Sequence, residues 1–341
     1  MVIKIFDETN CATCENVDCL TRCQWIEFEN VEDAKEEQMK MIKGENSRVL
    51  NECVTCFACD EYCPYGSHPF DLYVELQEKY NAHNIAPKII DMSVSRYKPH
   101  DELRLKELDP ENPVLNKCAF VKSHAKHLEG PIFEMQYVAG LDFFCNLLYH
   151  HVERDSVIRE RVPIIIENIK KQGIKEMICF HDECYGLYAS YCPRNNIEVP
   201  FKPIHIFEYL YNYLVDHKSE IKKLNMKVAY QRNCSNRFIP ETDEWLDKIC
   251  ELIGVERVAR KYDRENALCC AAPFPMLGMK SLLRPTQNKN IKDMLDHGAE
   301  TVIYNCPMCM ETLASKTERK GLKNYLVSDL CRLALGEELD Y

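Results

Sequence analysis

The last two thirds of the chain alternate between stretches with apolar residues at helical spacing and short runs of consecutive apolar residues. Residues 155–172 place valines and isoleucines along one helical face and end at Gly173, which predicts a helix packed on a sheet. A second helix is expected at 288–297, before Gly298, and the apolar run at 301–304 predicts a buried strand. Helices that alternate with strands in this way are typical of an α/β layer with a mostly parallel sheet.

The first third has a different pattern. Residues 31–43 contain no glycine or proline and are rich in Glu, Lys and Met, which predicts a helix with one solvated face. Residues 70–83 also favour a helix, and the polar, proline-containing stretch 95–113 predicts a linker. We therefore expect an α+β, multidomain chain in which a helical part precedes the α/β part.

An internal repeat relates the middle third to the last third. Residues 173–190 align with residues 298–315 at an offset of 125, with a glycine, an isoleucine, a cysteine, an alanine and a serine in register. The same offset relates Cys145 to Cys270, Phe144 to Cys269 and His181 to Cys306. The middle third therefore resembles a first copy of the α/β unit that has lost some of its cysteines.

Composition narrows the chemistry. The chain has 341 residues, enough for two or three domains, and 20 cysteines. Its first residues do not resemble a signal peptide, and no apolar run reaches the roughly 18 residues of a membrane span. We therefore expect a cytoplasmic protein whose clustered thiols bind metal rather than form disulfides. The net charge of −11 disfavours nucleic acid and acidic membrane surfaces as ligands, and it suits a basic patch on a partner protein.

Five cysteines in the last third have the spacing of a metal site. Their order is Cys234, 34 residues, the pair Cys269-Cys270, 35 residues, and then Cys306-x-x-Cys309. They follow an expected strand at 226–231, an expected helix at 242–254 and the strand at 301–304, so the three loops can converge. Adjacent thiols do not easily form a disulfide with each other, but they can bind two irons of one cluster. The nearby basic residues either hold an acidic substrate or form solvated surface; they are Arg232, Arg237 and Lys280.

Eight cysteines in the first third form two runs. The second run resembles the bacterial ferredoxin motif for a [4Fe–4S] cluster and reads Cys53-x-x-Cys56-x-x-Cys59-x-x-x-Cys63-Pro64. The first run has a longer middle gap and lacks the proline, and a zinc knot is the alternative to a cluster there; it contains Cys11, Cys14, Cys19 and Cys23. The resemblance to two-cluster ferredoxins implies that each run gives its last cysteine to the other cluster. The implied ligand sets are Cys11, Cys14, Cys19 and Cys63, and Cys53, Cys56, Cys59 and Cys23.

Together these motifs resemble the iron–sulfur subunits of heterodisulfide reductase, of the D type or the fused B/C type. In that family the five cysteines of a CCG domain hold a non-cubane [4Fe–4S] cluster that carries out disulfide chemistry. The resemblance implies this role for Cys234, Cys269, Cys270, Cys306 and Cys309. It also implies a helical ferredoxin domain at 1–100 with two [4Fe–4S] clusters, a degenerate first CCG half at 101–222 and an intact CCG half at 223–341. One position departs from the pattern, because the glycine that usually follows the cysteine pair is Ala271.

Four potential ligands remain in the first half, namely Cys118, Cys145, His181 and Cys184. One interpretation is a decayed cluster site that is kept as a scaffold beside the active cavity. The other is a mononuclear zinc site, because three thiolates and one imidazole are a common zinc ligand set.

Three functions are compatible with these motifs. The first is an oxidoreductase that receives electrons from a flavoprotein or ferredoxin through two [4Fe–4S] clusters and reduces a small disulfide at the C-terminal cluster. The second is a non-catalytic electron-transfer subunit of a flavin-dependent dehydrogenase, of the glycolate or lactate oxidase type or the fumarate or succinate type. The third is a metal-storage or cluster-carrier protein. The first two differ in whether the last cluster binds an external thiolate.

Overall fold

The N-terminal part of the chain is helical. The computed structural model describes residues 6, 8–120 and 124–339. The first helices are α1 (Glu8–Thr13), α2 (Asp18–Thr21), α3 (Val31–Ile42), α4 (Arg48–Glu52), α5 (Ala58–Tyr62), α6 (Pro69–Tyr80) and α7 (Pro87–Arg96). The two long helices predicted in this part are confirmed as α3 and α6. The side chain of Asn30 caps α3 by accepting a hydrogen bond from the amide of Asp33 at 2.9 Å.

A first parallel sheet follows the irregular stretch at 97–113. Its strands are β1 (Val114–Asn116), β2 (Tyr137–Val138), β3 (Glu176–Cys179) and β4 (Lys202–His205), in the order β2-β1-β3-β4. The helices of this part are α9 (Asp155–Lys171), α10 (Asp182–Gly186), a π-helix η5 (Leu187–Tyr191), α11 (Cys192–Arg194) and α12 (Ile206–Asp216). Short 3-10 turns complete it: η1 (Ala125–Leu128), η2 (Pro131–Phe133), η3 (Leu141–Phe143), η4 (Leu147–Val152) and η6 (Lys218–Glu220).

A second parallel sheet has the same arrangement. Its strands are β5 (Met226–Gln231), β6 (Val255–Arg257), β7 (Thr301–Tyr304) and β8 (Lys323–Leu326), in the order β6-β5-β7-β8. The helices are α13 (Asp243–Ile253), α14 (Lys280–Asp296), α15 (Pro307–Glu318) and α16 (Val327–Ala334), with the 3-10 turns η7 (Ser235–Phe238), η8 (Pro240–Thr242) and η9 (Arg264–Asn266). The helix expected to begin at 288 begins at Lys280 instead, and it contains Pro285.

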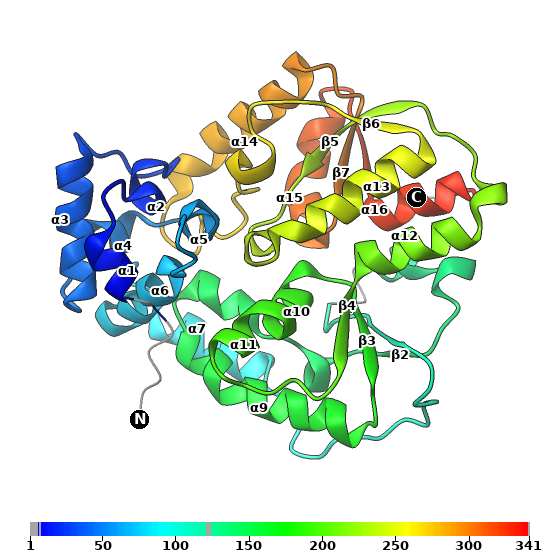
Figure 1. The fold of residues 1–341 in the computed structure, drawn as a ribbon, viewed down its shortest axis with the longest axis horizontal. Helices are drawn as coiled ribbons and strands as arrows, with labels where there is room; N and C mark the ends of the chain where they lie inside the picture. The colour runs from blue at the N-terminus through cyan, green and yellow to red at the C-terminus, as the bar shows by residue number, and fades with distance from the viewer. Residues whose placement is uncertain (1–5, 7, 121–123, 340–341) are drawn as a thin grey trace.

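The two sheets are related in sequence as well as in strand order. Strands β3 and β7 lie 125 residues apart, the offset of the repeat. The central strands of both sheets are buried because helices cover their two faces, and helices α12, α13 and α16 pack together between the sheets (Figure 1). The chain is thus α+β, with two small parallel sheets. Within the part that the structure describes, no helix is both long and apolar enough to cross a membrane.

The helical N-terminal part contacts both α/β parts through the short helix α5. Asp60 pairs with Arg194 of the first α/β part at 3.4 Å, and the next residue, Glu61, pairs with Arg232 and Arg237 of the second at 2.8 and 2.7 Å. Helix α5 contains Cys59 and is followed directly by Cys63, so these ion pairs fix two cysteines of the second run against the rest of the molecule (Figure 1).

Candidate metal centre

The five C-terminal cysteines lie where three parallel strands end. Cys234 follows β5, the pair Cys269-Cys270 lies in the loop after β6, and Cys306 follows β7, directly before α15. The neighbouring strands β5 and β7 continue to opposite sides of the sheet, and a crevice at the carboxyl ends of such strands is the usual ligand site of an open α/β sheet.

The thiols of this group interact with one another. Cys270 is hydrogen-bonded to Cys269 and Cys309, and Cys309 is hydrogen-bonded to Cys306 as well. The thiol of Cys234 lies within electrostatic reach of Cys270 and Cys306. The five cysteines that the spacing predicts therefore lie near one another, but no three of them are placed as the ligands of a bound metal ion would be.

The electrostatics of the group favour one thiolate. Hydrogen bonds from Cys269 and Cys309 lower the pKa of Cys270 well below its usual 9.0, whereas burial raises the pKa of Cys234 well above that value. Several buried thiolates at one site would repel one another, so they require a cationic centre to neutralise them. Soft, buried thiolates without a hard oxygen ligand suit an iron–sulfur cluster.

The backbone at the cysteine pair is shaped to hydrogen-bond sulfur. Ala271 has φ of 68°, in the left-handed region, and its amide donates to Cys269 Sγ at 3.3 Å. This conformation is costly for a residue with a Cβ, which explains why glycine is usual after the pair. Ala271 therefore replaces the usual glycine but adopts the same left-handed backbone conformation.

A buried carboxylate ties the ligand loops together. Asp182 accepts hydrogen bonds from Asn233 at 2.9 Å and Asn236 at 3.2 Å, from Asn305, and from His205 at 3.1 Å. Burial would raise the pKa of Asp182, but the hydrogen bonds from His205, Asn305 and Asn236 lower it to about 2. Since Asn233 precedes Cys234 and Asn305 precedes Cys306, the ionised Asp182 positions two cysteine loops of the other α/β part.

The N-terminal cysteines form two groups. In the first, Cys19 lies within electrostatic reach of Cys11, Cys14 and Cys63, and it accepts a hydrogen bond from the hydroxyl of Tyr73 at 3.6 Å. The grouping matches one of the two sets implied by the ferredoxin resemblance, in which the last cysteine of one run joins the first three of the other.

The second group contains the other four cysteines, although Cys59 also lies within electrostatic reach of Cys19 of the first group. Cys53 and Cys59 interact with Cys56, and Cys56 with Cys23. A cavity of about 30 Å³ lies beside them, lined by five cysteines and otherwise by aliphatic and aromatic side chains. Burial raises the pKa of Cys23 to about 11, which again calls for a metal centre before the thiol ionises. Donor chemistry and dry surroundings both fit a [4Fe–4S] cluster.

The first α/β part also has cysteines close to one another, but fewer than the second part. The thiol of Cys184 interacts with those of Cys118 and Cys145. The hydrogen bond from Cys184 and the nearby His181 lower the pKa of Cys118 to about 7. His181 Nδ1 contacts Glu183 at 3.4 Å, while the buried Nε2 atom has no hydrogen-bond partner. Both interpretations of this site, a scaffold and a zinc site, stay open.

None of the cysteine groups described above has its side chains in the positions of metal ligands. Across residues 6, 8–120 and 124–339, no three Cys, His, Asp or Glu side chains are arranged closely enough to hold a metal ion. All 20 thiols are free. Cys250 and Cys331, which lie outside these groups, are buried in the core as small hydrophobic residues.

Two of the basic residues near the C-terminal cysteines are not available to a substrate. Arg232 and Arg237 are buried and paired with Glu61, and Arg237 also donates to the carbonyl of Ala267 at 2.7 Å. The prediction that they hold a substrate or form solvated surface is wrong, because a carboxylate from the distant helix α5 occupies them. Lys280 is exposed at the start of α14.

Three residues important to the site were not found from the sequence. They are Glu61 and Asp182, and also His151, which contacts Cys234 Sγ at 3.3 Å. Asp182 follows His181 in the repeat and Glu61 lies inside the ferredoxin run, but nothing local indicates their partners.

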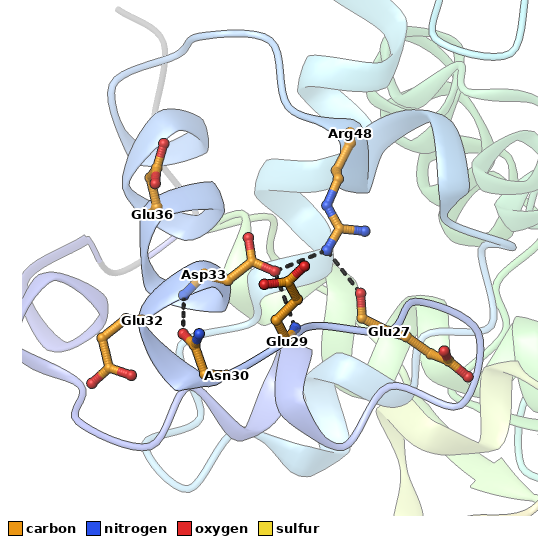
Figure 2. A pocket seen from close by; sticks show the side chains of 7 residues that line it. All are labelled: Glu27, Glu29, Asn30, Glu32, Asp33, Glu36 and Arg48. Carbon is orange, nitrogen blue, oxygen red and sulfur yellow. Dashed lines mark hydrogen bonds and ion pairs between the residues drawn. The ribbon is translucent and has the colours of Figure 1, made fainter.

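An acidic pocket lies on the helical part, away from the C-terminal cysteines. It is lined by Glu27, Glu29, Asn30, Glu32, Asp33, Glu36 and Arg48. Figure 2 shows Arg48 pointing toward Asp33, with an ion pair at 3.3 Å and a hydrogen bond to the carbonyl of Glu27 at 2.8 Å. The excess of carboxylates is consistent with a basic partner surface.

Comparisons with known proteins agree with the cysteine pattern. Residues 228–314 match the cysteine-rich domain CCG. The chain is 22% identical over 310 residues to the D-type subunit of dihydromethanophenazine:CoB–CoM heterodisulfide reductase from Methanosarcina barkeri, covering 82% of this chain and 75% of the relative. The corresponding protein of Methanosarcina acetivorans is 23% identical over 297 residues, covering 77% and 72%. These matches confirm the resemblance predicted from the cysteine spacing.

Solved structures add little. Glutamate racemase from Bacillus anthracis is similar over 65% of this chain and 79% of its own, at 12% identity and a TM-score of 0.35. A likeness at this level carries no argument about the fold or the site.

Proposed function

We propose that this chain, a relative of the D-type subunit of heterodisulfide reductase with a C-terminal CCG domain, is an iron–sulfur oxidoreductase subunit that reduces a disulfide at its last five cysteines. The observation that carries the proposal is the meeting of Cys234, Cys269, Cys270, Cys306 and Cys309 at the carboxyl ends of three strands. A match to the CCG domain over the same residues supports it.

The proposal assigns a ligand set to each cluster. Two [4Fe–4S] clusters are held by Cys11, Cys14, Cys19 and Cys63, and by Cys53, Cys56, Cys59 and Cys23, and a non-cubane [4Fe–4S] cluster is held by the C-terminal five. We assign the first two to a ferredoxin domain at 1–100, followed by CCG halves at 101–222 and 223–341. The identical strand order of the two sheets supports an origin by duplication.

Electrons have a short route between the groups. The charges of Cys56 and Cys234 influence each other, so the second N-terminal group borders the C-terminal group. Reduction of a disulfide consumes two electrons and two protons and releases two thiols. When bound, the clusters supply one-electron transfer. The residues of the chain hold the cysteine loops in place through Asp182 and Glu61 and keep bulk water away from the buried thiols.

A second candidate is a relay subunit that passes electrons to a dehydrogenase and binds no substrate. It is favoured by the burial of the C-terminal thiols, of which Cys309 is only 3% exposed. Both candidates imply a flavoprotein or ferredoxin partner, whereas only the first requires a small thiol or disulfide at the last cluster.

Electron paramagnetic resonance on the anaerobically purified full chain separates these candidates. The protein is oxidised with and without a small thiol, and the Cys270→Ala variant is measured alongside. Disulfide chemistry predicts a paramagnetic signal that requires thiol and is lost in the variant. A full complement of clusters without a thiol-dependent signal would replace the first proposal with the relay.

A further inference from the structure

His151 connects two cysteine groups that come from opposite ends of the chain. It lies in η4 and is buried, and its Nε2 atom is 3.3 Å from Cys234 Sγ. Its Nδ1 atom is 2.8 Å from the hydroxyl of Thr55. Phe57 stacks on the imidazole with the ring centres 4.9 Å apart, so the orientation of the ring is fixed from a third direction.

Thr55 belongs to the ferredoxin run, between Cys53 and Cys56. Its own amide donates to Cys53 Sγ at 3.4 Å, and its hydroxyl contacts His151. A continuous series of contacts therefore leads from Cys53 through Thr55 and His151 to Cys234. The hydroxyl of Thr55 is fully buried, and the imidazole is its hydrogen-bond partner.

Hydrogen-bond chemistry determines the direction of these contacts once Cys234 binds iron. A metal-bound cysteine is a thiolate and can only accept a hydrogen bond, so Nε2 of His151 must carry the proton. Nδ1 is then free to accept the hydroxyl proton of Thr55, which holds the ring in this tautomer.

Building on the proposed function, we propose that His151 is a positioning residue that donates its Nε2 proton to Cys234 and thereby raises the reduction potential of the C-terminal cluster. Hydrogen bonds to cluster sulfur favour the reduced, more negative state, and they are one of the main determinants of cluster potential. Thr55 supports this role by orienting the ring. With clusters bound at both sites, a raised potential at Cys234 would favour electron transfer from the group at Cys53 to the group at Cys234.

The test is a redox titration of the full chain with its clusters, followed by electron paramagnetic resonance. We expect the C-terminal cluster of His151→Leu to have a lower midpoint potential than the wild type. His151→Gln restores part of the difference because its amide can also donate. Thr55→Val, which is isosteric but lacks the hydroxyl, shifts the potential in the same direction by less, and Thr55→Ser leaves it unchanged.

His150→Leu is the matched control. His150 is buried in the same aromatic cluster, 5.9 Å from Phe57 between ring centres, but its Nε2 atom pairs with Asp155 and neither ring nitrogen is hydrogen-bonded to a cysteine of the described residues. Its replacement can weaken the fold without changing the potential. Equal potentials in His151→Leu and wild type, with iron content intact, would overturn the role of His151. Absence of the C-terminal cluster from the wild type would instead refute the proposed function itself.

Discussion

The two α/β parts share a frame but differ in chemistry. Their strand orders are the same, and in each a residue with positive φ follows the cysteine after the second strand, Asn146 at 63° and Ala271 at 68°. The second part presents five thiols at its strand ends, whereas the first has Phe144 and His181 where the repeat aligns Cys269 and Cys306. If the second part binds a cluster as proposed, the sheet supplies positions for ligands, and the residues in three loops decide whether those positions hold a cluster.

One of the two replaced positions of the first part, Phe144, has become part of the hydrophobic core. Phe144 is fully buried and packs against Phe120 and Tyr97, with ring centres 5.3 and 5.7 Å away. Aromatic packing occupies the space in which the second part places a ligand. The first part still contributes to the site of the second through the hydrogen bonds that Asp182 accepts from Asn233 and Asn305.

The largest difference between the two α/β parts should be the change in iron content when equivalent cysteines are replaced by alanine. Cys270→Ala removes the thiol that joins Cys269 and Cys309, so we expect the loss of one cluster, about 4 irons per chain. Cys145→Ala, at the equivalent position of the first part, should keep all the iron. Iron and zinc are counted by atomic emission on each purified variant. Iron loss in Cys145→Ala would mean that the first part also holds a cluster, and zinc loss would mean that it holds zinc.

Replacing Asp182 tests whether this residue positions the cysteine loops, since it is not itself a proposed cluster ligand. Asp182→Ala leaves the donors of His205 and three asparagines without their buried acceptor, and we expect a loss of about 4 kcal/mol in the apparent free energy of unfolding. Anaerobic urea unfolding followed by circular dichroism measures it. Asp216→Ala on the exposed end of α12 serves as the control, with a change within about 0.5 kcal/mol. Similar values for both variants would exclude the proposed positioning by Asp182.

The next largest effect on the free energy of unfolding should come from the ion pairs between helix α5 and the second α/β part. Glu61→Gln removes the charge that Arg232 and Arg237 share, and we expect a loss of about 2 kcal/mol in the same assay. Glu52→Gln is the matched control, since Glu52 pairs with Arg48 at 3.1 Å near the surface, where an ion pair contributes about 0.5 kcal/mol or less. Equal losses of unfolding free energy in Glu61→Gln and Glu52→Gln would contradict a stabilising role of the Glu61 ion pairs.

The smallest effect concerns the turn after the cysteine, and its sign should differ between the parts. Ala271→Gly relieves a left-handed conformation and should stabilise the protein by about 0.5 kcal/mol. Asn146→Gly should destabilise it by about 1 kcal/mol, because Asn146 donates to the carbonyl of Phe144 and accepts from Arg161. Thermal unfolding of both variants gives the comparison, and a shift of the same sign in both would refute it.

Local sequence patterns predicted the frame well. The offset of 125 matched β3 with β7, and Cys234 and Cys306 follow the predicted strands at 226–231 and 301–304. Strand β6, which precedes the pair Cys269-Cys270, was not predicted. These features depend on neighbours along the chain. The partners of Arg232 and Arg237 could not be found in this way, because the carboxylate of Glu61 lies 171 residues from Arg232 and reaches it only after the parts have packed. The contact of His151 with Cys234 is hidden for the same reason.

Iron counted per chain on the anaerobically purified protein tests the central claim most directly. Two [4Fe–4S] clusters and one non-cubane [4Fe–4S] cluster predict about 12 irons, with a spectrum that loses one component in Cys270→Ala. About 8 irons, unchanged in that variant, would contradict the account, because the five C-terminal thiols would then converge without holding a cluster.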